Sequence, residues 1–172
     1  AATKTASEVI KAGNVEVIES FETTHFSIVD KAGNAVSVTT TLNDNYGNKL
    51  AVKGAGFLLN NEMDDFSIKP GVPNMYGLVG GEANAIAPEK RMLSSMTPTI
   101  VEKNGKLFMV VGTPGGSTII TSVYQAILNV TRHGMTMQEA VNAKKIHSQW
   151  LPDQVFVEQG AIDSLTQTTL EG

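Results

Sequence analysis

The sequence predicts one α+β domain, or a large piece of one, with a mainly antiparallel sheet. Two β-branched runs between residues 24 and 43 alternate with a period of two around a short turn, which is typical of a hairpin. A second strand pair and two helical patterns follow, without the strand-helix-strand repeat of a parallel sheet. Hairpins followed by helices therefore indicate a layered α+β fold.

Composition narrows the classes of function. The chain has 172 residues, of which 41% are hydrophobic and 17% charged, so it is long enough to form a core. Its net charge of -4, without a cluster of Lys or Arg, argues against a nucleic-acid partner. The absence of Cys excludes disulfides, thiol catalysis and Cys-ligated zinc. Without a basic cluster, we expect a small or polar ligand. No apolar run is long enough for a membrane span.

The first 22 residues read as a tail or linker, and both ends of the chain look cut, as in a fragment of a longer protein. Thr23 follows Glu22 at the head of the first strand. If the Glu22-Thr23 bond is cut, Thr23 carries both a hydroxyl and a free amine. An α-amine has a pKa of about 7.7 to 8.0, so at neutral pH it can accept the hydroxyl proton.

The first hairpin comprises THFSIVD, a turn over residues 31–34, and AVSVTTTLN. Antiparallel pairing places the end that carries Thr41 and Asn43 beside Thr23. Residues 44–56 read as a loop, and residues 56–59 as a short buried run. Residues 69–90 hold too many Pro and Gly for a helix or a central strand, so we expect a long ordered loop that acts as a lid.

Further elements follow in order. Residues 99–101 and 107–111 read as strands around an Asn104-Gly105 turn, and a helical pattern starts near residue 119. A capping box at Thr136 and Glu139 begins a second helix, expected to reach His147, and VFVEQG reads as a strand. We expect Trp150 in the core.

Several local patterns suit chemistry. Gly115 and Gly116 stand at the mouth of a helix, where outward backbone N–H groups suit an oxyanion hole, although a tight turn without a ligand explains them equally. Acidic residues near 62–65 can hold an ammonium group and Ser94-Ser95 a carboxylate, unless they are ordinary solvated loop residues. The three His lack ligand spacing, so we expect no metal and no cofactor.

Long motifs then identify a family. TTHFSIVDKAGNAVSVTTTLN, LLNNEMDDFSIKPGVPNMYGLVGGEANAIAPEKR, LSSMTPTIV and VVGTPGGS, in this order, closely resemble the small-subunit region of γ-glutamyltranspeptidases. The resemblance runs from about Glu19 to Pro152. It implies an N-terminal nucleophile hydrolase, an αββα layered sandwich whose precursor cleaves itself before a Thr. Residues 1–22 would end the large subunit, and residues 23–172 would form a small subunit truncated at its C-terminus.

The resemblance also implies roles for single residues. Cleavage would fall between Glu22 and Thr23, with Thr23 as the nucleophile and Thr41 assisting it. The remaining roles are α-amino binding by Asn43, Glu62 and Asp65, α-carboxylate binding by Ser94 and Ser95, the oxyanion hole at Gly115 and Gly116, and a lid containing Tyr76.

The function that the resemblance implies is γ-glutamyl transfer and hydrolysis, acting on glutathione and similar amides through a γ-glutamyl ester of Thr23. Its partners would be the large subunit of the same precursor and an acceptor amino acid, peptide or water. The family is usually periplasmic or secreted. Two alternatives stay open: a related acylase or poly-γ-glutamate processing enzyme, and an uncleaved noncatalytic homologue.

Overall fold

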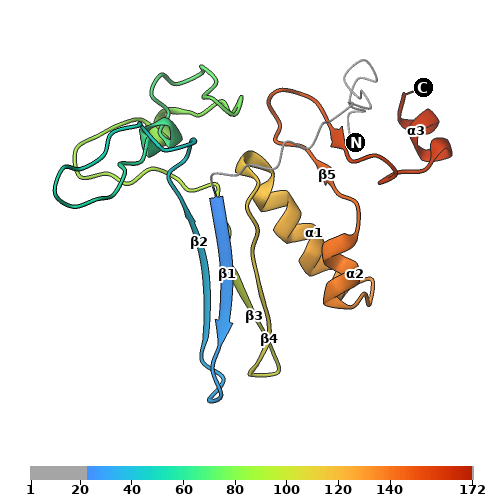
Figure 1. Cartoon of the computed structure of the whole chain (residues 1–172). Coiled ribbons are helices and arrows are strands. Elements are labelled where there is room, and N and C mark those ends of the chain that lie inside the picture. The colour runs from blue at the N-terminus through green and yellow to red at the C-terminus, as the bar shows by residue number, and fades with distance from the viewer. Residues whose placement is uncertain (1–22, 172) are drawn as a thin grey trace. The chain divides into compact units, whose positions relative to one another are not determined.

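The computed structural model describes residues 23–171, and the predicted tail, including Glu22, lies outside them. The described chain combines helices with antiparallel strand pairs, as predicted (Figure 1). It forms two compact units that divide between Val123 and Tyr124, inside helix α1. Each unit is described by itself below.

Strands β1 (Thr23–Val29) and β2 (Ala35–Thr41) form the predicted hairpin. Their antiparallel register pairs Thr23 with Thr41. The Asp30 carboxylate closes the turn because it accepts hydrogen bonds from the N–H groups of Ala32 at 2.8 Å and Asn34 at 2.9 Å. An acidic side chain that bonds the backbone ahead of it is typical of an Asx turn. The turn therefore fixes the register that brings the two Thr together.

Strands β3 (Thr99–Lys103) and β4 (Lys106–Val111) form a second antiparallel pair, also as predicted. Asn104 and Gly105 between them have φ angles of 55° and 71°, the left-handed values that a tight two-residue hairpin requires. β2 lies against both strands of this pair (Figure 1). The Ser37 hydroxyl donates a hydrogen bond to the Val111 carbonyl at 3.3 Å, so the polar face of the first hairpin turns toward β4.

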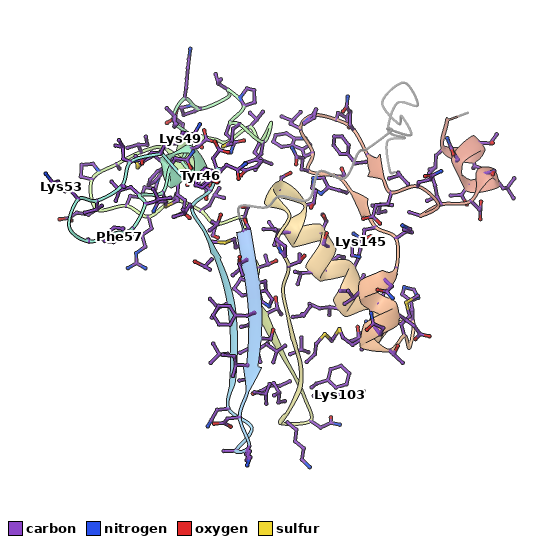
Figure 2. The ribbon with its side chains drawn as sticks, viewed as in Figure 1. Tyr46, Lys49, Lys53, Phe57, Lys103 and Lys145 are labelled. Carbon is purple, nitrogen blue, oxygen red and sulfur yellow. The ribbon has the colours of Figure 1, made fainter. Side chains whose placement is uncertain are left out.

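Between β2 and β3 the chain is mostly loop, interrupted by single 3₁₀ turns at Glu62–Asp65 and Glu82–Asn84. The predicted long loop over residues 69–90 is confirmed. The expected buried run at residues 56–59 is wrong, since Phe57 is 55% exposed (Figure 2). A hydrophobic run as short as this one carries no period that would reveal which way its side chains point.

After β4 the chain passes through a 3₁₀ turn (Gly116–Thr118) into α1 (Ile119–Thr131). Ile119 and Val123 at the start of α1 are buried, as are Met109 and Val111 on β4. Their spacing on α1 follows the predicted helical period. These buried side chains lie on the strand before the Gly-Gly turn and on the helix after it.

The second unit contains the rest of α1 and four short elements: α2 (Met137–Asn142), β5 (Ile146–His147), β6 (Phe156–Val157) and α3 (Ser164–Glu171). The predicted capping box at Thr136 and Glu139 is present. The helix ends at Asn142, however, so the expected extension to His147 is wrong.

Contacts of Lys145 and Ile146 explain why α2 ends at Asn142. The Gln125 side chain pairs with both backbone groups of Ile146, at 2.7 and 3.0 Å, which holds that segment extended. The Lys145 ammonium group also caps the carbonyls of Val141 and Ala143, both at 2.9 Å (Figure 2). Tertiary contacts therefore override the local helical pattern.

Two further expectations for this part of the chain need correction. Trp150 is 76% exposed in this chain rather than part of its core. The predicted strand VFVEQG exists only as β6, which pairs with β5, and α3 was not predicted. α3 begins where the Asp163 carboxylate accepts a hydrogen bond from the N–H of Thr166 at 2.6 Å, a cap that lacks a strong apolar period behind it.

Candidate active site

The two threonines at the open end of the first hairpin lie in hydrogen-bond contact. The Thr23 hydroxyl donates to the Thr41 hydroxyl at 3.1 Å. The Thr41 oxygen also accepts a hydrogen bond from the N–H of Asn43 at 2.9 Å. Thr23 is only 9% exposed, which is unusual for a polar residue at a strand end. A buried hydroxyl with a fixed partner is what a positioned nucleophile needs.

Asn43 turns the chain directly after β2. Its φ angle is 76°, a left-handed value that Asn tolerates better than most residues, and its side chain is 5% exposed. Its amide nitrogen donates to the carbonyl of Asn61 at 3.4 Å. The backbone of Asn61 donates in turn to Leu42 at 3.1 Å, and its side chain accepts from the N–H of Asp44 at 3.0 Å. Asn61 thus fastens the acidic 3₁₀ turn to the end of β2.

The acidic turn Glu62–Asp65 concentrates three carboxylates. Burial, and then the charges of Glu62 and Asp64, raise the pKa of Asp65 to about 6. Burial also raises the pKa of Glu62. A nearby cation would lower both pKa values, because it favours the charged form of each carboxyl group. The turn therefore suits an ammonium group.

Asp64 has a different role from its neighbours. Its carboxylate accepts a hydrogen bond from the N–H of Met75 at 3.2 Å, and its carbonyl accepts from the side chain of Asn74 at 3.5 Å. The side-chain oxygen of Asn74 accepts from the N–H groups of Tyr76 and Leu78, both at 3.0 Å. Asp64 and Asn74 thus shape the loop that carries Tyr76.

Tyr76 joins two parts of the predicted site. Its hydroxyl donates to the backbone carbonyl of Asn43 at 2.7 Å. Its ring lies so close to Gly116 that a Cβ built there would be 3.1 Å from the ring. The side chain therefore covers the Gly-Gly turn on one side and holds the end of β2 on the other.

The Gly-Gly turn has a backbone that few other residues could adopt, with φ angles of 142° at Gly115 and 54° at Gly116. The carbonyl of Gly115 accepts hydrogen bonds from the N–H of Thr118 at 3.0 Å and from its hydroxyl at 2.8 Å. In a trans peptide the N–H of the next residue points opposite to that carbonyl. The N–H of Gly116 therefore points away from the helix, as an oxyanion donor should.

The serine pair follows the long loop. Ser94 is exposed and its hydroxyl accepts a hydrogen bond from the N–H of Met96 at 3.1 Å, whereas Ser95 is half-buried. The residue before the pair, Leu93, donates its N–H to the side chain of Asn84 at 3.0 Å. Asn84 also donates to the carbonyl of Asp65 at 2.7 Å. The serine segment and the acidic turn are thus linked through one side chain.

Hydrogen bonds therefore connect most of the predicted site residues within the first unit, from Thr23 through Asn43 and the acidic turn to the serine segment. Sequence reasoning missed the three asparagines that make these connections: Asn61, Asn74 and Asn84. The available signal was their position in loops, where Asn side chains commonly bond the nearby backbone.

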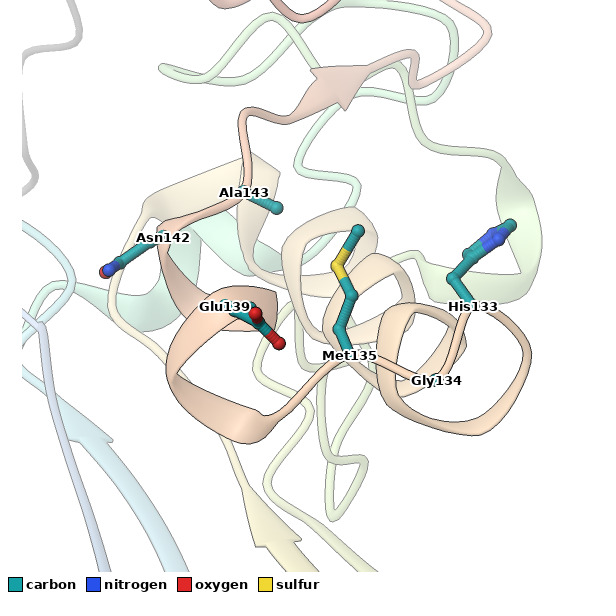
Figure 3. A pocket seen from close by; sticks show the side chains of 6 residues that line it. All are labelled: His133, Gly134, Met135, Glu139, Asn142 and Ala143. Carbon is teal, nitrogen blue, oxygen red and sulfur yellow. The ribbon is translucent and has the colours of Figure 1, made fainter.

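A separate open pocket lies in the second unit, lined by His133, Gly134, Met135, Glu139, Asn142 and Ala143 (Figure 3). The Glu139 carboxylate is engaged in the capping box, and the side-chain oxygen of Asn142 accepts from Gln138 at 3.1 Å. None of the residues predicted for the site lines it. The polar side chains of Glu139 and Asn142 are thus engaged within α2 and its cap.

Residues 23–171 contain neither a metal-binding cluster nor a helix that could span a membrane. No three His, Asp or Glu side chains there gather closely enough to hold a metal ion. No helix in that range is long and apolar enough to cross a membrane.

Comparison with known proteins identifies the class to which this fold and site belong. The sequence model of the gamma-glutamyltranspeptidase family matches residues 1–172, and the chain belongs to that family. It is 57% identical over 154 residues to the glutathione hydrolase proenzyme of Escherichia coli, covering 90% of this chain and 27% of that protein. It is 58% identical over 165 residues to the glutathione hydrolase proenzyme of a Pseudomonas species, covering 96% of this chain and 28% of that protein.

Solved structures agree with the sequence comparison. The crystal structure of a Helicobacter pylori gamma-glutamyltranspeptidase mutant superposes with a TM-score of 0.81 at 59% identity. The match covers 86% of this chain and 79% of that one. The chain thus spans a little over a quarter of the curated relatives but most of the matched crystallographic chain.

Proposed function

We propose that this chain is the catalytic part of a self-cleaving enzyme that transfers or hydrolyses γ-glutamyl groups. The observation that carries the proposal is the buried Thr23 hydroxyl in contact with Thr41 at the head of β1. Membership in the gamma-glutamyltranspeptidase family and close relatives that are glutathione hydrolase proenzymes support the same reaction. Those relatives favour glutathione and similar amides as donors over the acylase, poly-γ-glutamate and noncatalytic alternatives.

Self-cleavage comes first. The Thr23 oxygen attacks the carbonyl carbon of Glu22, the peptide C–N bond breaks, and the freed nitrogen takes the hydroxyl proton. Water then hydrolyses the resulting ester, which leaves a carboxylate on Glu22 and a free amine on Thr23. Thr41 holds the attacking hydroxyl in place.

Turnover then uses the new amine. It accepts the Thr23 hydroxyl proton as the oxygen attacks the γ-carbonyl of the donor, and the N–H groups of the Gly115-Gly116 turn stabilise the oxyanion. The amide nitrogen leaves with a proton, so a γ-glutamyl ester remains on Thr23. Water or an acceptor amine resolves that ester and returns the proton to Thr23.

The charges of the site suggest how it would bind the α-ammonium and α-carboxylate groups of the γ-glutamyl donor. The ammonium group would lie against Glu62 and Asp65 with the side-chain oxygen of Asn43, because its charge lowers the cost of ionising both carboxyl groups. The hydroxyls of Ser94 and Ser95 would bind the α-carboxylate. Tyr76 would close over the site, as its contacts with Asn43 and Gly116 suggest.

The remaining part of the precursor is the proposed partner. The outer face of the first hairpin exposes Phe26, Ile28 and Val36, each at least 44% accessible, while its polar face turns toward β4. An exposed apolar sheet face typically marks a surface that another part of the protein or a partner buries. We assign that cover to the large subunit, whose end would be residues 1–22, within an αββα sandwich. A periplasmic or secreted location rests on the family resemblance alone.

Mass spectrometry of the whole precursor tests the proposal. Incubation should yield a fragment whose N-terminal residue is Thr23, together with release of the anilide from a chromogenic γ-glutamyl anilide. Thr23→Ala should give neither product. An intact precursor that nevertheless turns over the anilide, or a cleaved one that does not, would contradict the assignment of Thr23.

A further inference from the structure

We propose that Asn84 is a positioning residue that holds the acidic turn and the serine segment at the separation an α-amino acid head group requires. The inference rests on the proposed function, since it concerns how that site selects its substrate. Asn84 donates to the carbonyl of Asp65 at 2.7 Å and accepts from the N–H of Leu93, beside Ser94, at 3.0 Å. One side chain thus contacts both of the segments that would hold the substrate.

The backbone around Asn84 is fixed from both sides. Its carbonyl accepts a hydrogen bond from the N–H of Ser67 at 3.0 Å, and its own N–H donates to Gly81 at 3.1 Å. The Lys90 ammonium group donates to the carbonyls of Ala83 at 2.6 Å and Ala85 at 2.9 Å, the two neighbours of Asn84. The side chain is half-buried. It therefore acts as a rigid spacer and not as a mobile surface group.

The chemistry of the two contacts explains the choice of residue. The Asp65 carbonyl needs a donor, and the Leu93 N–H needs an acceptor. A primary amide offers both in one plane, whereas Ala offers neither and Ser has too short a side chain to span them. Asn is the smallest side chain that satisfies both groups at once.

A spacer between two binding segments has a specific consequence. A ligand with both an α-amine and an α-carboxylate gains from the correct separation, because both contacts form together. A ligand that lacks one of these groups uses one segment and is insensitive to the separation. Loss of the Asn84 link should therefore weaken only the ligand that carries both groups.

The test measures competitive inhibition of γ-glutamyl anilide hydrolysis by the self-cleaved whole protein. The three inhibitors are L-glutamate, which has both groups, glutarate, which lacks the amine, and 4-aminobutanoate, which lacks the α-carboxylate. Asn84→Ala is compared with Asn48→Ala, which removes an exposed Asn whose side chain accepts a hydrogen bond from the nearby N–H of Leu50 at 2.9 Å. Asn84→Ser provides a milder variant if the Ala protein does not fold.

In Asn84→Ala the inhibition constant of L-glutamate should rise about tenfold, and the other two should change less than about threefold. Asn48→Ala should match the parent for all three. An equal rise for all inhibitors would show a general structural role and overturn the proposal, as would no change at all. A parent protein that neither cleaves itself nor hydrolyses the anilide would instead refute the proposed function.

Discussion

The hydroxyls of Thr23 and Thr41 lie 3.1 Å apart across the first pair of the β1–β2 ladder. The Thr41 oxygen also accepts the N–H of Asn43, so its position is set by the backbone beyond β2 as well as by its own strand. Two constraints on Thr41 therefore orient the single hydroxyl of Thr23.

Replacing Thr41 tests this constraint. Thr41→Val keeps the shape but removes the hydroxyl, so we expect kcat for a γ-glutamyl anilide to fall about tenfold to a hundredfold with a smaller change in KM. Thr41→Ser keeps the oxygen and should retain most of the activity. Equal kcat values for the Val and Ser variants would argue against a role for the hydroxyl.

The pH dependence of turnover should report Asp65. Its pKa is raised to about 6 by burial and by the charges of Glu62 and Asp64. In the proposed site only the ionised carboxylate would attract the substrate ammonium group, so kcat/KM should rise with pH through about 6. Asp65→Asn should lose this step and keep any later rise from the Thr23 amine near pH 8 (about its ordinary pKa). The same step in the Asn variant would assign it to another group.

The raised pKa of Asp65 should also make the free energy of unfolding fall with pH, whereas kcat/KM should rise. Because the pKa of Asp65 is raised from 3.8 to about 6, the folded chain keeps a proton that the unfolded chain has already lost. The free energy of unfolding should therefore decrease as pH rises from about 4 to about 6 and then level off. Denaturant titrations of parent and Asp65→Asn across this range measure the effect. The Asn variant should lack this decrease, and identical pH profiles would contradict the assignment.

Tyr76 should contribute through two separable contacts. Tyr76→Phe keeps the ring against Gly116 and loses the bond to Asn43, a net loss of about 1 kcal/mol that should raise KM a few-fold. Tyr76→Ala also uncovers Gly116, so kcat should fall as well. Tyr46→Phe is the matched control, since Tyr46 is 70% exposed (Figure 2). A Tyr46 effect as large as that of Tyr76 would count against the assigned contacts.

Gly112 should be intolerant of any side chain. A Cβ built there would overlap the imidazole ring of His25. That ring is held by hydrogen bonds to the hydroxyls of Thr39 at 2.8 Å and Ser27 at 3.0 Å. Gly112→Ala should therefore lower the free energy of unfolding by about 1 to 3 kcal/mol.

Thermal denaturation of the whole protein measures this loss. Gly81→Ala is the control, because nothing lies within 4 Å of its Cβ position and its φ of -110° suits any residue. Its effect should stay within about 0.5 kcal/mol. Equal melting temperatures for the two variants would mean that His25 moves aside freely.

Several regular elements of both units could be predicted because their patterns are local. The alternation of apolar and polar residues predicted both hairpins. The Asn104-Gly105 turn and the Thr136 capping box carry short-range signals that the structure confirms. The predicted extension of α2 beyond Asn142 is wrong because Gln125, distant in sequence, holds Ile146 extended. No local pattern carries that information.

The candidate site, too, could be predicted only in part. The residue types of the site were identified through long motifs, and the contact between Thr23 and Thr41 follows from strand register. The links through Asn61, Asn74 and Asn84 could not be predicted, since each joins a loop side chain to backbone groups that only the folded loop brings near. The roles of the substrate-binding residues stay predictions from the resemblance.

Hairpin register also bears on the order in which the protein assembles. Thr23 and Thr41 are separated by 18 positions, so they meet as soon as one local hairpin closes, within about 1–10 μs for such an element. The serine segment and the Gly-Gly turn join them only through much longer loops, which close later. During synthesis the nascent chain can thus bring Thr23 and Thr41 together before the proposed substrate-binding residues meet. Maturation would then be limited by later steps than the meeting of the two hydroxyls.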